Sequence, residues 1–60
     1  MKDRTERLRK DCSVIIADLC EYDKDNEKLL DELVSLDELE LRQYKVGLRR
    51  DLKSYENLNV

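Results

Sequence analysis

The sequence LRKDCSVIIADLCEYDKDNEKLLDELVSL, residues 8–36, determines the fold expected for this chain. Apolar side chains recur along it at alternating steps of four and three residues, which is the heptad repeat of a coiled-coil helix. Its a and d positions are Leu8, Cys12, Ile15, Leu19, Tyr22, Asn26, Leu29, Leu33 and Leu36. This repeat, the first seam, predicts a helix with one apolar stripe that another helix must cover.

A second seam follows over residues 41–58, shifted by one residue in the heptad frame. Its core positions are Leu41, Tyr44, Leu48, Tyr55 and Leu58, and Leu52 lies next to Asp51, the one charged residue at a core position. An insertion between two heptad runs unwinds a supercoil locally without ending the helix. We therefore expect residues 1–60 to be one all-α oligomerisation segment, a coiled coil whose single long helix measures about 80–90 Å.

The alternative is a turn near residues 23–27, where the apolar repeat is weakest. The chain would then form a helix-turn-helix hairpin, and two hairpins would dimerise into a four-helix bundle. A wide apolar face favours this alternative, because four further apolar residues lie outside the narrow stripe: Ile16, Leu30, Val34 and Leu39. Turns usually contain glycine or proline, and the gap has neither, so the continuous helix is the favoured prediction.

A second possible helix start is the capping-box sequence SLDE at residues 35–38. Its flanking residues, Val34 and Leu39, are apolar, as expected for a segment within a helix. We therefore predict that the helix continues through these residues as well.

Asn26 is the one polar residue at a core position of the first seam. In a parallel, in-register pair such an asparagine bonds its counterpart, which lowers stability and fixes the register. The other interpretation places Asn26 at the tip of a loop. The register role is the favoured prediction, and it implies that Asn26→Leu raises thermal stability.

The net charge of −3 is unevenly distributed. Residues 1–10 carry a net +3, residues 11–40 a net −9, and residues 41–60 a net +3. Acidic residues also flank the first seam, so a parallel homodimer would bring like charges together. The acidic middle therefore predicts a basic surface opposite it, supplied by a second helical chain or by the basic ends of another copy.

The residue types argue against catalysis. The chain has no histidine and only one glycine, so it lacks the usual base and any glycine-rich phosphate loop. Cys12 and Cys20 lie eight residues apart on the expected helix, too far to form a disulfide or to share a metal. We predict no enzyme activity and no cofactor, metal or small-molecule ligand. Nucleic acid and anionic membranes are disfavoured because the basic residues 1–10 include no aromatic residue or glycine and the chain as a whole is acidic.

Length and composition favour association with another chain. A chain of 60 residues, 45% of them charged, buries too little surface to be more than marginally stable alone. We therefore expect a protein–protein interaction and oligomerisation segment of a larger scaffold, cytoskeletal or motor-associated protein, forming a homodimer or higher bundle. The alternative is a small helical-hairpin regulatory or adaptor protein. The lack of a signal sequence or membrane-length apolar run favours a cytoplasmic or nuclear location.

Overall fold

The computed structural model describes residues 4–58, which are helical throughout except at two chain reversals. The elements are α1 (Arg4–Tyr22), the 3₁₀ helix η1 (Lys24–Lys28), α2 (Leu29–Leu33) and α3 (Glu38–Leu58). Since η1 leads directly into α2, the two form one helical arm. The predicted all-α class is confirmed. Lys2, part of the predicted basic N-terminal block, lies outside the described residues.

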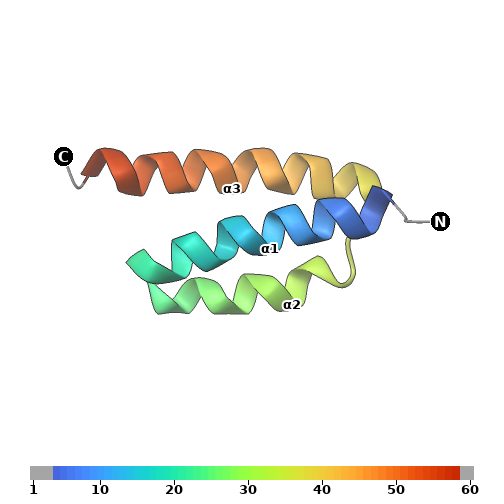
Figure 1. Cartoon of the computed structure of the whole chain (residues 1–60), viewed down its shortest axis with the longest axis horizontal. Coiled ribbons are helices and arrows are strands. Elements are labelled where there is room, and N and C mark those ends of the chain that lie inside the picture. The colour runs from blue at the N-terminus through green and yellow to red at the C-terminus, as the bar shows by residue number, and fades with distance from the viewer. Residues whose placement is uncertain (1–3, 59–60) are drawn as a thin grey trace.

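The helices lie side by side along one long axis (Figure 1), with α1 between the η1–α2 arm and α3 in this view. The arm runs antiparallel to α1, and α3 runs in the same direction as α1. The Cα atoms extend over 42 × 17 × 16 Å. One continuous helix would be about 80–90 Å long. The predicted single long helix is therefore not observed, because the chain reverses twice.

The first reversal is built by Asp23 and Asn26. Asp23 has extended backbone angles, φ −151° and ψ 114°, which end α1 after Tyr22. Its carboxylate accepts a hydrogen bond from the backbone N–H of Asp25 at 3.0 Å and so caps η1. The Asn26 amide nitrogen donates to the backbone oxygens of Leu19 and Asp23, both at 3.1 Å. Each of these carbonyls also accepts a backbone N–H, that of Leu19 from Asp23 at 2.9 Å and that of Asp23 from Asn26 at 3.1 Å, so the Asn26 side chain gives both a second donor.

The turn predicted as the alternative near residues 23–27 is therefore present. This turn needs neither glycine nor proline, because any residue can adopt the extended backbone angles found at Asp23. No described residue has a positive φ angle. Asn26 closes a turn within one chain in this structure, as in the interpretation that placed it in a loop.

The second reversal ends at a capping box formed by Asp37 and Glu40. The Asp37 carboxylate accepts from the Glu40 N–H at 2.9 Å, and the Glu40 carboxylate accepts from the Asp37 N–H at 3.1 Å. The box lies two residues after the one noted in the sequence at Ser35. The phase shift between the seams falls here, so it separates α2 from α3. The prediction of an uninterrupted helix is wrong at this point, because the first seam ends with α2 and the second seam lies on a separate helix, α3.

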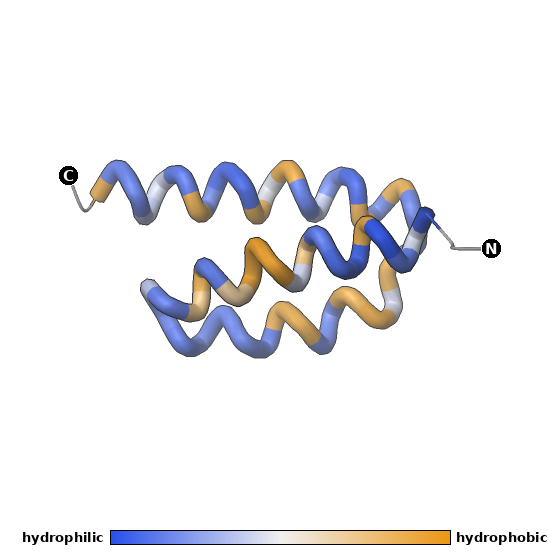
Figure 2. The backbone as a smooth tube through the Cα atoms, viewed as in Figure 1, coloured by the Kyte–Doolittle hydropathy of each residue, from blue (hydrophilic) through white to orange (hydrophobic). Residues whose placement is uncertain are grey.

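The core combines buried side chains from all three α-helices: Cys12, Ile16 and Leu19 from α1, Leu33 from α2, and Leu41 and Leu48 from α3. Figure 2 shows the longest hydrophobic stretch of the chain in α1, which lies centrally in that view. Burying one such leucine is worth about 1.5–3 kcal/mol. The two seams therefore cover each other within one chain.

Arg9 and Asp11 of α1 make polar contacts with the other helices. The Arg9 guanidinium donates from Nε to the Leu33 carbonyl at 3.1 Å and from Nη2 to the Leu36 carbonyl at 3.5 Å. Arg9 thus caps the C-terminus of α2, where a cation also favours the helix dipole. The Lys45 ammonium of α3 lies 3.1 Å from the Asp11 carboxylate of α1.

Candidate protein-interaction surface

The structure places the residues predicted as an intermolecular interface mainly inside the bundle. Those buried are Cys12, Leu19, Leu33, Leu41 and Leu48, and those half-buried are Leu8, Ile15, Asn26, Leu29, Leu36, Tyr44, Leu52 and Tyr55. Tyr22 is exposed, and its ring stacks on that of Tyr55 with centroids 5.2 Å apart. The two seams were identified from the heptad spacing, whereas their pairing within one chain was missed.

Burial makes the Cys12 thiol a poor nucleophile. The Cys12 thiol is fully buried and donates to the Leu41 carbonyl at a sulfur–oxygen distance of 3.7 Å. Burial raises the pKa of Cys12, with Lys45 opposing and Asp11 reinforcing the rise. A raised pKa lowers the thiolate fraction, and the thiolate is the reactive form. Cys20 is half-buried, and both thiols are free.

No cluster of metal-binding side chains is found among residues 4–58. Within that range, no three histidine, cysteine, aspartate or glutamate side chains are grouped closely enough to hold a metal ion. None of the described helices is long and apolar enough to cross a bilayer.

A shallow groove of about 370 Å³ runs between α1 and the end of the arm. Its apolar lining comes from Leu30, Leu33 and Val34, and its α1 side is polar, with Arg9 and Lys10 among the lining residues. Leu33 is 2% exposed and belongs to the core, whereas Val34 is 74% exposed. The groove thus joins the core to an uncovered apolar side chain.

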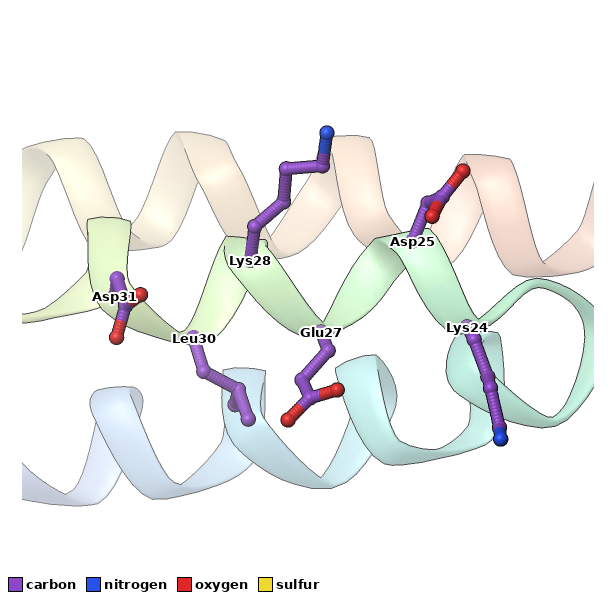
Figure 3. Close-up of a pocket in the computed structure, with 6 residues that line it drawn as sticks. All are labelled: Lys24, Asp25, Glu27, Lys28, Leu30 and Asp31. Carbon is purple, nitrogen blue, oxygen red and sulfur yellow. The ribbon is translucent and has the colours of Figure 1, made fainter.

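The outer surface of the arm carries a row that alternates acidic and apolar residues, the acidic row. It consists of Glu27, Leu30, Asp31 and Val34, all exposed and spaced as neighbours on one helix face. A second hollow, of about 410 Å³, is lined by Glu27, Leu30 and Asp31 together with Lys24, Asp25 and Lys28. In Figure 3, Lys24, Glu27 and Leu30 extend to one side of the arm, and Asp25 and Lys28 extend to the other.

The outer surface of α3 carries a row of opposite charge, the basic row. It consists of Leu39, Arg42, Val46, Arg50 and Lys53, which are exposed and follow one another at steps of three or four residues. Leu39 is 64% exposed and Val46 is 61% exposed. Arg42 pairs with Glu38 on the same helix at 3.5 Å. No ion pair is described for Arg50 or Lys53, so their charges are available to a partner.

Tyr44 and Glu32 form a polar contact between α3 and the arm. The Tyr44 hydroxyl donates to the Glu32 carboxylate at 2.8 Å. Burial, followed by this hydrogen bond and the Glu32 charge, raises the pKa of Tyr44 to about 12. Tyr44 therefore stays a neutral donor at physiological pH. The sequence placed Tyr44 in the second seam but did not reveal its partner on the arm.

Three features of the site were not anticipated from the sequence. Arg9 caps α2 from a distance of 24 residues along the chain, and no local pattern indicates that. The Asp37–Glu40 box has the spacing of a helix start, and the phase shift between the seams lies next to it, so the sequence does contain a signal for this break. The apolar residues Leu30, Val34 and Leu39, expected to widen the covered face, are exposed.

Comparison with known proteins gives no match: no family model, curated protein or solved structure is similar to this chain.

Proposed function

We propose that this chain is a protein-interaction module that associates as a folded three-helix bundle, and that a second copy is its partner. The observation that supports this function best is the exposure of Val34, Leu39 and Val46, each more than 60% accessible, on a bundle whose seams are already covered. Apolar side chains that a small fold leaves in rows between charged residues are typical of binding surfaces. The module resembles the small helical adaptor more than the rod-like stalk.

Association through the first seam would require the bundle to open. Cys12 would have to leave Leu41, Leu19 would have to leave the core, and Arg9 would have to release the end of α2. Each exposed leucine would lose about 1.5–3 kcal/mol of burial before a new contact formed. Association of closed bundles avoids this cost, since it uses residues that the fold leaves uncovered.

Sedimentation velocity and native-state cysteine alkylation together test this function. We expect compact single chains at about 10 µM and larger species at about 1 mM, the weak affinity typical of a small polar interface. Cys12 should stay protected from alkylation at both concentrations, with the half-buried Cys20 as the internal reference.

Two results would contradict the proposal. If the mass stays that of a single chain up to about 1 mM, self-association is wrong. If Cys12 protection rises with concentration, then the seam itself is the interface and the bundle opens to associate.

A further inference from the structure

We propose that copies of this chain join by packing the basic row of α3 on one copy against the acidic row of the arm on the next. This inference rests on the proposed function, because it names the surfaces through which folded bundles would associate. It also names a basic surface, the basic row of another copy, for the acidic residues 11–40 to face.

The two rows complement each other in charge and in apolar content. The basic row offers Leu39 and Val46 with Arg50 and Lys53, while its Arg42 already pairs with Glu38. The acidic row offers Leu30 and Val34 with two carboxylates, and Lys24 and Lys28 lie beside them. Apolar residues that meet at the centre of such a contact exclude water, and the charges around them select the partner. Two basic rows or two acidic rows would repel, so only the unlike pairing is favoured.

The position of the rows sets the symmetry of the assembly. In Figure 1 the arm and α3 lie at the two edges of the bundle, and the Tyr44–Glu32 hydrogen bond shows that they also contact each other. The two rows lie on different helices, so one copy can contact two neighbours, one through each row. Such head-to-tail contacts produce rings or open chains of subunits.

The size of the rows predicts a weak, salt-sensitive contact. The stretch from Leu39 to Lys53 is about 21 Å long at the helical rise of ~1.5 Å per residue. The acidic row is shorter, so the buried area lies at the lower end for specific interfaces. Exposed ion pairs are screened within about 10 Å at ~0.1 M salt. We expect the association constant to fall about tenfold or more between low salt and about 0.5 M salt.

The tyrosines argue against nucleic acid as the partner of the basic row, because each of them already has a partner within the bundle. Single-stranded nucleic acid is bound by bases stacking on aromatic rings beside basic residues. Tyr22 and Tyr55 stack on each other, and Tyr44 is bonded to Glu32. No described aromatic side chain lies in the basic row.

Charge reversal of each row, alone and in mixture, tests the inference. The first variant is Arg50→Glu with Lys53→Glu, and the second is Glu27→Lys with Asp31→Lys. The first has two acidic rows and the second two basic rows, so each should associate about tenfold more weakly than the wild type. Mixed together, the variants again offer unlike rows, and association should return to near the wild-type level.

Matched controls carry the same changes of charge elsewhere. Arg4→Glu with Arg7→Glu, and Asp18→Lys with Glu21→Lys, alter exposed residues of α1 outside both rows. They should leave association within about twofold of the wild type. Far-UV circular dichroism checks that every variant folds, and sedimentation velocity at low salt gives the association constants.

Each contrary outcome has a distinct meaning. If the wild type associates and either row variant does so equally well, or if the mixture does not recover, the pairing is wrong while the proposed function stands. If the wild type stays monomeric, both are wrong. If reversing Arg50 and Lys53 abolishes binding to single-stranded DNA but not self-association, the basic row binds nucleic acid instead.

Discussion

The two chain reversals of this molecule differ in the origin of their hydrogen bonds. At the first, the side chains of Asp23 and Asn26 bond only to residues between Leu19 and Asn26. At the second, the capping box is equally local, but Arg9 of α1 also binds the carbonyls that end α2. The first turn is therefore specified by one short stretch of sequence, whereas the second depends on a helix that lies against it only after folding.

The largest expected effect concerns the core at the two ends of α2. Leu33, next to the second reversal, is 2% exposed, whereas Leu29, nearer the first, is half-buried. We expect Leu33→Ala to lower the free energy of unfolding by about 2–5 kcal/mol, and Leu29→Ala by less, because the cavity left at a half-buried site fills with water. Urea unfolding followed by circular dichroism measures both. Equal losses would show that the two ends of α2 are packed alike.

Removing the Arg9 guanidinium should weaken the second reversal and leave the hydrogen bonds of the first unchanged. Arg9→Met retains most of the apolar stem and leaves the end of α2 without its donor, so we expect a loss of about 1.5–3 kcal/mol. Arg9→Lys should recover only part of it, since an ammonium lacks the planar fork that reaches two carbonyls. Urea unfolding again gives the values. Arg7→Met, at an exposed position of the same helix, is the control and should stay within about 0.5 kcal/mol of the wild type.

At the first reversal, Asn26→Leu should destabilise the bundle by about 1 kcal/mol, because two carbonyls lose their side-chain donor. The sequence alone predicted a gain in stability for this change, so the outcome discriminates sharply between the folds. Asn26→Asp should be at least as harmful, since a carboxylate cannot donate and its charge opposes the C-terminal dipole of α1.

Thermal unfolding at several concentrations measures the effect of both Asn26 variants. A rise in melting temperature for Asn26→Leu, together with a concentration-dependent mass, would instead support the parallel coiled coil. Unchanged melting in both variants would show that the Asn26 bonds contribute nothing to the turn.

The smallest expected effect is the alkaline titration of Tyr44, which joins α3 to the arm between the reversals. Its pKa is raised to about 12, so the folded state holds the phenol proton more tightly than the unfolded state. The resulting stability is complete below pH ~10, the pKa of a free tyrosine, and is lost as pH rises toward that of the folded state. Absorbance at 295 nm should show one tyrosine titrating last, and Tyr44→Phe should remove that phase. Persistence of the late phase in Tyr44→Phe would assign it to Tyr22 or Tyr55.

Heptad spacing predicted most of the buried residues, but it did not predict which helix covers them. Cys12, Leu19, Leu33, Leu41 and Leu48, all placed at seam positions, are the buried residues together with Ile16. The spacing records which side of a helix is apolar, and it is the same whether the covering helix comes from the same chain or another. For the same reason, the sequence does not show that the acidic row of the arm and the basic row of α3 are exposed. Their exposure depends on which helix faces the fold covers.

The sequence by itself determined that the chain is helical, which residues form the apolar face of each helix, and where the seam changes phase. Local side-chain chemistry at Asp23, Asn26 and Asp37 also lies in the sequence, although its consequence was not recognised. Only the tertiary structure decided that the chain reverses twice and covers its own seams. Reversal depends on bonds such as those of Arg9 to α2, and on the burial of α1 between two partners, which exist only once distant segments meet.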